Sequence, residues 1–196
     1  MNEPMATQYS LVTCQGLTKS YGKKPALQGV DLHLQRGRIV GLLGPNGSGK
    51  TTLIKILCGL LQPTDGTVTI DGGGIGVRSK SIISYLPDRM YFADWIRATD
   101  LFDLFADFYA DFDRAKAMSM CASLGVDPRD KIKTMSKGTK EKVQLVLVMA
   151  RKAQLYLLDE PIAGVDPAAR DFILNTILTN YNENGTVLIS THLISD

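Results

Sequence analysis

The chain has 196 residues, of which 44% are hydrophobic and 21% are charged, so it is long enough for one domain with a substantial core. With 22 Lys and Arg against 20 Asp and Glu, the formal charge is +2, which argues against a protein whose main affinity is for nucleic-acid phosphates. The three cysteines are far apart and form no CxxC pair or cysteine–histidine cluster, so they indicate neither a disulfide framework nor a zinc site. They favour a reducing cytosol.

The N-terminus lacks a basic start followed by an apolar stretch, so it does not predict a secretory signal. No uninterrupted apolar run approaches the ~20 residues that a membrane-spanning helix needs. We therefore expect a soluble chain, which a partner would have to bring to any membrane.

The first half of the chain predicts short strands that alternate with turns. These strands cover residues 10–17, 29–34, 38–43, 67–71 and 82–86. A polar connection at 19–25 separates the first two strands, and the apolar run at 38–43 (RIVGLL) predicts a strand that is buried on both faces. A glycine-rich loop and a helix at 51–61 follow it. The glycine cluster at 72–76 predicts a plain hairpin turn without a ligand.

The second half predicts more helix. Five apolar side chains between residues 95 and 112 share one helical face and are expected to form core, while four aspartates share another, solvated face. The apolar set is Leu101, Leu104, Phe105, Phe108 and Phe112, and the acidic set is Asp100, Asp103, Asp107 and Asp111. Helices are predicted at 137–152 and 168–179, and strands at 155–158 and 186–190.

Alternating strands and helices predict an α/β fold with a mainly parallel sheet. The stretch from about 95 to 134 reads as a helical insertion. We expect one domain over residues 1–196, with a helical subdomain at about 95–150.

The strongest motif is a match to G-x-x-x-x-G-K-[ST] between a predicted strand and a predicted helix, which is the context that a P-loop requires. It consists of Gly44, Pro45, Asn46, Gly47, Ser48, Gly49, Lys50 and Thr51, and Thr52 follows. In a P-loop, backbone N–H groups and the helix N-terminus surround phosphate oxygens. Lys50 is then expected to reach the β- and γ-phosphates of ATP, and Thr51 to bind Mg²⁺. The alternative is a glycine-rich turn before an ordinary helix.

A second motif is the apolar run at 155–158 that ends in Asp159 and Glu160. Acids at the carboxyl end of a strand beside the P-loop strand can face the metal ion of a nucleotide. Asp159 is the candidate Mg²⁺ ligand, and Glu160 is the candidate that polarises the attacking water. Acidic pairs also simply end strands or cap helices, so the P-loop is what favours function here. His192, after the last predicted strand, can bind a γ-phosphate or a carboxylate that holds water.

Together these residues resemble the nucleotide-binding domain of ABC transporters, from about Leu11 to the end of the chain. The resemblance implies a P-loop NTPase core with a mainly parallel sheet, an N-terminal antiparallel β subdomain and an inserted helical subdomain. Residues 134–140 (TMSKGTK) resemble the family's signature loop, and residues 160–167 (EPIAGVDP) resemble its catalytic glutamate and D-loop. Ser190-Thr191-His192 resembles its switch histidine, and Tyr21 the aromatic residue that stacks on adenine. A small GTPase would need the guanine-reading NKxD motif, which the sequence lacks.

Two positions depart from the family pattern. The signature keeps Ser136 and Gly138 but has Lys137 in place of a glycine and Thr139 in place of glutamine; we expect Lys137 to face solvent. Asp88 stands where the family usually has the Q-loop glutamine, and a carboxylate there can still bind Mg²⁺ or hold water. Similar variants resemble the subgroup that pairs with exporter-type or ABC-2-like membrane subunits.

The resemblance implies a mechanism in which two such domains enclose two ATP molecules head to tail. Each site then combines Lys50, Thr51, Asp159 and Glu160 of one chain with Ser136 and Gly138 of the other. It also implies a transmembrane permease subunit that docks near Tyr91, Phe92 and Trp95, and a cytoplasmic location on the inner face of the membrane. The main alternative is a soluble ABC-type ATPase that acts on ribosomes or DNA. Because the family usually continues past the switch histidine, we expect a truncated C-terminus.

Overall fold

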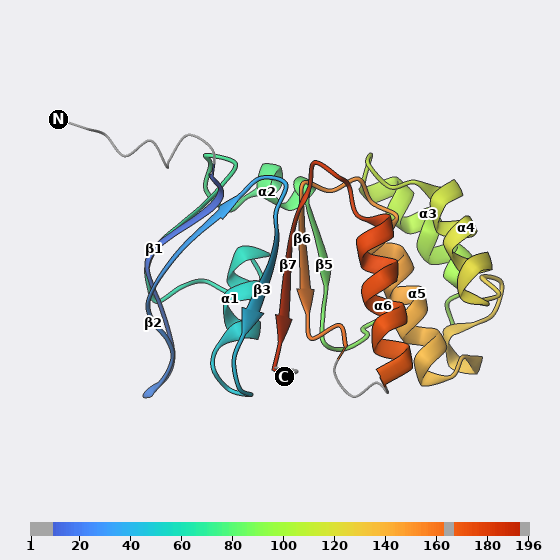
Figure 1. Cartoon of the computed structure of the whole chain (residues 1–196), viewed down its shortest axis with the longest axis horizontal. Helices are drawn as coiled ribbons and strands as arrows, with labels where there is room; N and C mark the ends of the chain where they lie inside the picture. The colour runs from blue at the N-terminus through green and yellow to red at the C-terminus, as the bar shows by residue number, and fades with distance from the viewer. Residues whose placement is uncertain (1–9, 163–166, 193–196) are drawn as a thin grey trace.

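The computed structural model of this protein describes residues 10–162 and 167–192 (Figure 1). The chain begins with a three-stranded antiparallel sheet of order β2-β1-β4, formed by β1 (Ser10–Tyr21), β2 (Lys24–Gln35) and β4 (Asp65–Ile70). The strands β1 and β2 pair as far as Tyr21 and Lys24, so most of the connection predicted at 19–25 is strand. Gly22 makes the tight turn with a φ of 59°.

The second sheet is parallel and has the order β3-β7-β6-β5. Its strands are β3 (Ile39–Leu43), β5 (Ile83–Leu86), β6 (Leu155–Asp159) and β7 (Thr186–Thr191). All five residues of β6 are buried. Because side chains alternate along a strand, Leu155 and Leu157 pack in one apolar cluster, whereas Tyr156 and Leu158 pack in another.

The first apolar cluster lies between the two sheets, where α1 (Lys50–Leu57) is sandwiched (Figure 1). The short helix α2 (Val77–Ile82) follows β4 and leads into β5. Asp71 and Gly72 form a two-residue turn with positive φ at both positions, and Ile70 and Gly73 exchange two backbone hydrogen bonds across it, so the expected hairpin turn is present. The glycine cluster then ends at Gly76, which is the N-cap of α2 and donates its N–H to Ser79 Oγ.

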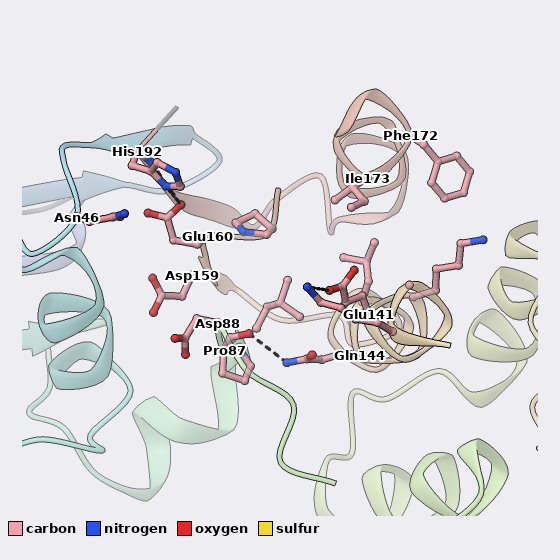
Figure 2. Close-up of a pocket in the computed structure, with 16 residues that line it drawn as sticks. Asn46, Pro87, Asp88, Glu141, Gln144, Asp159, Glu160, Phe172, Ile173 and His192 are labelled. Carbon is pink, nitrogen blue, oxygen red and sulfur yellow. Dashed lines mark hydrogen bonds and ion pairs between the residues drawn. The ribbon is translucent and has the colours of Figure 1, made fainter. Parts of the chain in front are cut away.

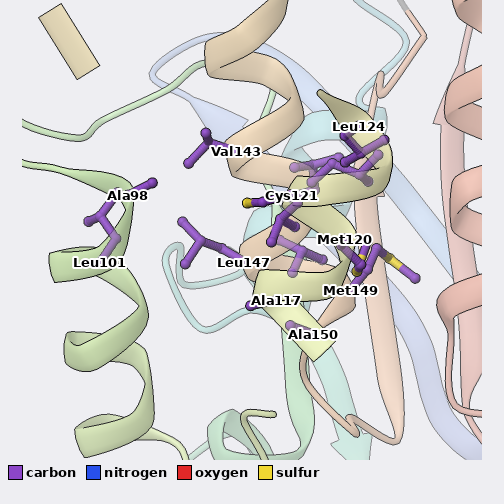
Figure 3. Packing of buried hydrophobic residues seen from close by; sticks show 14 of the residues in the cluster. Ala98, Leu101, Ala117, Met120, Cys121, Leu124, Val143, Leu147, Met149 and Ala150 are labelled. Carbon is purple, nitrogen blue, oxygen red and sulfur yellow. The ribbon is translucent and has the colours of Figure 1, made fainter. Parts of the chain in front are cut away.

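The second cluster lies on the other side of the parallel sheet and holds the remaining helices. These are α3 (Ala98–Phe108), α4 (Arg114–Leu124), the 3₁₀ turn η1 (Ile132–Thr134), α5 (Lys137–Met149) and α6 (Pro167–Asn180). Figure 3 shows α3, α4 and α5 packing through small and medium-sized side chains such as Ala98, Cys121 and Leu147. With both sheets and the helices in place, the predicted α/β fold with an N-terminal antiparallel sheet and a helical insertion is confirmed.

Two burial predictions were wrong. On α3, Leu101 and Phe102 are buried, but Leu104 and Phe108 are 44% and 75% exposed, because α4 and α5 cover only the face that carries Ala98, Leu101 and Phe102. In the parallel sheet, β3 is an edge strand whose Leu43 is 59% exposed, so it is not buried on both faces.

One of the aspartates expected on a solvated face has a structural partner. Asp111 accepts two hydrogen bonds from the buried guanidinium of Arg151, at 2.8 and 3.1 Å. Arg151 also donates to the carbonyl oxygens of Ser81 and Ile83, beside β5, and its guanidinium lies 3.7 Å from the ring centre of Tyr109. This one side chain therefore ties the segment after α3 to the edge of the parallel sheet.

Within the described ranges, no helix combines the length and the apolar character needed to cross a lipid bilayer.

Candidate functional site

The P-loop lies between the end of β3 and the start of α1, as the motif predicts. Gly49 precedes α1 with a φ of 94°, a conformation that side chains disfavour, and a Cβ there would collide with the carbonyl of Ala26 in β2. At Gly44, a Cβ would lie 2.7 Å from Ser48 Oγ. These two glycines therefore allow the loop to close tightly against its own hydroxyl and the neighbouring strand.

Lys50 points back into this loop. Its ammonium donates to the carbonyl oxygens of Gly44 at 2.6 Å and Pro45 at 3.1 Å, and its Nζ lies 3.2 Å from Oε1 of Glu160. The Lys50 side chain is only 7% exposed. A cation this deeply buried needs anionic or carbonyl partners, and phosphate oxygens can take the same place.

Asp159, at the end of β6, accepts hydrogen bonds through Oδ1 from Thr51 at 3.1 Å and from Ser190 at 2.7 Å. Among the described residues, its second oxygen, Oδ2, is buried without a hydrogen-bond partner. Burial raises the pKa of this carboxyl, and hydrogen bonds from Ser190 and Thr51 oppose the rise. An orphaned carboxylate oxygen beside a threonine hydroxyl is a donor set that suits Mg²⁺.

The Glu160 side chain is fixed by His192, and the Glu160 backbone is strained. Its Oε2 lies 2.7 Å from His192 Nδ1, and its own backbone N–H donates to Ser190 Oγ at 2.9 Å. Its φ of 51° is in the left-handed region, which is costly for a glutamate. Burial would raise the pKa of Glu160, but hydrogen bonds from His192 and Lys50 outweigh it and lower the pKa. At the end of the sheet, the Glu160 carboxylate is therefore fixed and ionised, and it projects from a strained backbone.

A cavity of about 360 Å³ runs from the β1–β2 turn across the P-loop to Glu160. Most of the residues predicted to bind ATP or its metal ion, or to act in catalysis, line it: Tyr21, Asn46, Gly47, Gly49, Lys50, Thr51, Thr52, Asp88 and Glu160. Tyr21 is half-exposed at its mouth, and Lys19 Nζ lies 5.5 Å from the ring centre. Gly44, Pro45 and Ser48 belong to the same loop without lining the cavity.

A wider cleft of about 570 Å³ opens between the carboxyl end of the sheet and the helices (Figure 2). Asp88 lies below Asp159 in this view, and Glu160 and His192 lie above it. Gly138 lines the opposite wall, at the start of α5. Residues predicted to bind the metal and part of the predicted signature thus face one cleft of the same chain.

The predicted signature, residues 134–140, includes the start of α5. The Ser136 hydroxyl caps this helix by accepting a hydrogen bond from the Thr139 N–H at 3.1 Å. The Lys137 side chain is 85% exposed, as expected, and its Nζ lies 3.8 Å from Glu141 Oε1. Of the predicted D-loop, residues 163–166 lie outside the described residues.

Sequence reasoning assigned no role to Ser190 or to Gln144. Ser190 connects Asp159 to the backbone of Glu160, and its position at the end of a strand just before His192 was the available signal. Gln144 donates through Nε2 to the carbonyl of Pro87 at 3.1 Å, a contact across 57 residues that no local pattern indicates.

An apolar groove of about 440 Å³ lies behind this cleft. Tyr91 and Phe92 line it together with Leu60 and Phe105. Trp95, which was expected nearby, is 72% exposed and is not among the lining residues.

Comparison with known proteins identifies the family. A family model described as ABC transporter matches residues 27–163, and the chain therefore belongs to the ABC transporter family. It is 32% identical to the manganese transport system ATP-binding protein MntB of Bacillus subtilis, over 92% of this chain and 76% of that protein. It is 30% identical to the linearmycin resistance ATP-binding protein LnrL of the same organism, over 95% of this chain and 62% of LnrL.

Several curated relatives are longer than this chain, which spans between 51% and 62% of the length of three of them. Among solved structures, one from Pyrococcus furiosus that is assigned to an ABC transporter ATP-binding protein is 29% identical. It has a TM-score of 0.81 over 94% of this chain and 92% of that chain. A dimeric ATP-binding cassette bound to ADP and Pi shares the fold, with a TM-score of 0.80 at 23% identity.

Proposed function

We propose that this chain binds ATP with Mg²⁺, hydrolyses it, and uses the cycle to open and close a dimer that drives a membrane permease. The observation that carries this proposal is the network at the carboxyl end of the sheet, in which Lys50 and His192 both contact Glu160 and Thr51 contacts Asp159. Family membership supports ATP as the nucleotide.

Phosphate binding falls to the P-loop. The Lys50 ammonium exchanges its contacts with Gly44, Pro45 and Glu160 for the β- and γ-phosphate oxygens, and the backbone N–H groups before α1 complete the cradle. Tyr21, at the mouth of the cavity, stacks on the base.

The metal site consists of Thr51, Asp159 and Asp88. The orphaned Oδ2 of Asp159 would supply one ligand, the Thr51 hydroxyl would supply another, and the Asp88 carboxylate in the same cleft would supply a third. When bound there, Mg²⁺ would supply positive charge that stabilises the negative charge developing on the phosphate oxygens.

Glu160 polarises the attacking water. Its lowered pKa keeps it ionised near neutral pH, and His192 fixes the orientation of its carboxylate. Release of Lys50 toward phosphate frees Oε1 of Glu160 for the water, so that binding of the nucleotide itself prepares the base.

The second half of each site comes from a partner chain. Ser136 and Gly138 lie at the N-terminus of α5, where a hydroxyl and backbone N–H groups can bind the γ-phosphate held by another copy or a related domain. The shared fold of the dimeric cassette solved with ADP and Pi supports this arrangement.

The permease docks in the apolar groove lined by Tyr91 and Phe92, and it holds the chain at the inner face of the membrane. In this proposal residues 1–196 act as one domain, in which residues 95–150 form the helical part that carries the signature and contributes one side of the groove, including Phe105. The relation to MntB supports a transport role.

The Glu160→Gln substitution tests the proposal. We expect ATP turnover to fall by about 10²–10⁴ while ATP binding persists, because the amide cannot act as a base. On size-exclusion chromatography with saturating MgATP, the variant should elute as a dimer. Glu183→Gln, an exposed glutamate outside the site, is the matched control.

A Glu160→Gln variant that binds MgATP and stays monomeric would contradict the head-to-tail dimer. If the Glu160→Gln variant hydrolysed ATP as fast as the wild type, Glu160 would not be the residue that polarises the attacking water. Co-purification of the tagged protein from detergent-solubilised membranes tests the permease: a stoichiometric multispanning protein is expected, and ribosomal or chromosomal partners alone would overturn transport.

A further inference from the structure

The contact between Gln144 and Pro87 joins two distant parts of the proposed ATP site. Gln144 lies in the middle of α5, the helix that begins at the signature, and its side chain is only 7% exposed. Its amide Nε2 donates to the carbonyl of Pro87 at 3.1 Å (Figure 2). Pro87 follows β5 directly and precedes Asp88, so the hydrogen bond fixes the backbone next to the carboxylate of Asp88, a proposed metal ligand.

Gln144 and Pro87 also separate two cavities. Both residues line the cleft that contains Asp159 and Glu160, and both line the apolar groove on the other side. The hydrogen-bonded pair is therefore a shared wall, with the catalytic cleft on one face and the proposed permease groove on the other.

Little else in the described part of the chain fixes Asp88. Its one ion pair there is with Arg89 at 3.8 Å, and the Arg89 side chain is 82% exposed, so this pair restrains the carboxylate weakly. The hydrogen bond from Gln144 to the carbonyl of Pro87 is a firmer restraint, because the Gln144 residue is only 7% exposed and breaking the bond would leave its amide donor without this partner.

A buried amide in this helix also requires a reason. The neighbours Val143 and Leu145 are apolar and buried, and an apolar residue at 144 would avoid the cost of burying an amide. A role for the amide donor accounts for its presence.

We propose that Gln144 is a positioning residue for the metal site: through the carbonyl of Pro87 it holds Asp88 opposite Asp159. This inference rests on the proposed function. It makes the placement of Asp88 depend on α5, so that any rotation of the helical layer, which carries Ser136 and Gly138, also moves a ligand of the cation in the chain's own site.

The test compares nucleotide binding with and without metal. The affinity for mant-AMPPNP, a fluorescent ATP analogue that is not hydrolysed, is titrated in Mg²⁺ and in EDTA for the wild type, Gln144→Met and Asp88→Ala. Methionine keeps the length and packing of glutamine but cannot donate. We expect Gln144→Met to reduce the Mg²⁺-dependent gain in affinity about three- to tenfold, with the affinity in EDTA unchanged.

The double variant shows whether Gln144 acts through Asp88. If it does, Gln144→Met adds no further loss of Mg²⁺ dependence in an Asp88→Ala background. Ser84→Ala is the matched control, because Ser84 Oγ donates to Val148 O at 2.9 Å and so forms another buried bond between β5 and α5, away from Asp88. Ser84→Ala should lower the melting temperature and leave the Mg²⁺-dependent gain intact.

A Gln144→Met protein that melts at a lower temperature but keeps the full Mg²⁺-dependent gain would show a merely structural role and overturn the inference. Additive losses in the double variant would also overturn it. Absence of mant-AMPPNP binding by the wild-type protein under both conditions would instead overturn the proposed function, on which the inference depends.

Discussion

The carboxyl end of the parallel sheet and the helical layer of α3, α4 and α5 are built on opposite principles. At the sheet end, charged and polar groups are buried and one backbone is strained, as the ammonium of Lys50, the Oδ2 of Asp159 (unpaired among the described residues) and the positive φ of Glu160 show. The helical layer is held by apolar side chains, from the large Phe102 to the small Cys121, both fully buried. The comparison indicates that the residues for function and the residues for stability are largely separate. The sheet end carries the proposed ligand site, and the helical layer stabilises the fold.

The largest expected effect on the free energy of unfolding comes from substitutions in α3. Phe102→Ala should cost about 3–5 kcal/mol in the free energy of unfolding, because Phe102 is fully buried against α4 and α5. Phe108→Ala, on the same helix, should change it by less than about 0.5 kcal/mol, because Phe108 is 75% exposed. Urea unfolding measures both values, and equal losses would contradict the observed face of α3.

A smaller effect is expected at the nucleotide. Tyr21→Ala should weaken ATP binding by about 1–3 kcal/mol through lost stacking, with little change in the free energy of unfolding, because Tyr21 is half-exposed. Phe108→Ala serves as the control for loss of an exposed aromatic ring. Calorimetric titration with ATP gives the affinities, and unaltered binding by Tyr21→Ala would exclude it from the site.

The smallest expected effect compares two buried thiols. Burial, followed by the negative charge of Asp159, raises the pKa of Cys58 to about 12, and burial raises that of Cys121 to about 11. Raised pKa values keep both thiols neutral and unreactive until the chain opens locally or the pH approaches those values. At pH 8, ATP at about ten times its Kd should slow alkylation of Cys58 about tenfold, because opening of α1 destroys the P-loop.

Cys121 lies in α4, away from the nucleotide, so its alkylation should slow much less. Peptide mass spectrometry resolves the two sites in one sample. If ATP slowed the alkylation of both thiols equally, the two regions would open as a single unit. That result would contradict the separation of the sheet end from the helical layer.

Local motifs made the sheet end predictable from the sequence. The loop from Gly44 to Thr51, and Asp159 and Glu160 at the end of an apolar run, each carry their chemistry within a few residues, so their positions follow once the strands are located. Their mutual contacts, such as Ser190 with Asp159, required the parallel pairing of β6 with β7.

The helical layer was less predictable, because the neighbouring helices, and not the periodicity of the sequence, decide which face of a helix is buried. The stripe that includes Leu104 and Phe108 is regular, yet α4 and α5 cover the adjacent face with Phe102. Helix α4 itself was missed as a separate element, although Ala117, Met120, Cys121 and Leu124 recur at helical spacing, because small side chains give a weak apolar signal. Gln144 is invisible locally, since its partner lies 57 residues away.

The strand order β3-β7-β6-β5 has a consequence for synthesis of the protein on the ribosome. The outer strands β3 and β5 emerge early, but the strands that join them, β6 and β7, end at Asp159 and Thr191. The antiparallel sheet β2-β1-β4 can pair as soon as Ile70 has emerged, whereas the parallel sheet has to wait for more than a hundred further residues. We therefore expect the nucleotide site to form last and all at once, with the N-terminal sheet as the early scaffold on which the nascent chain completes it.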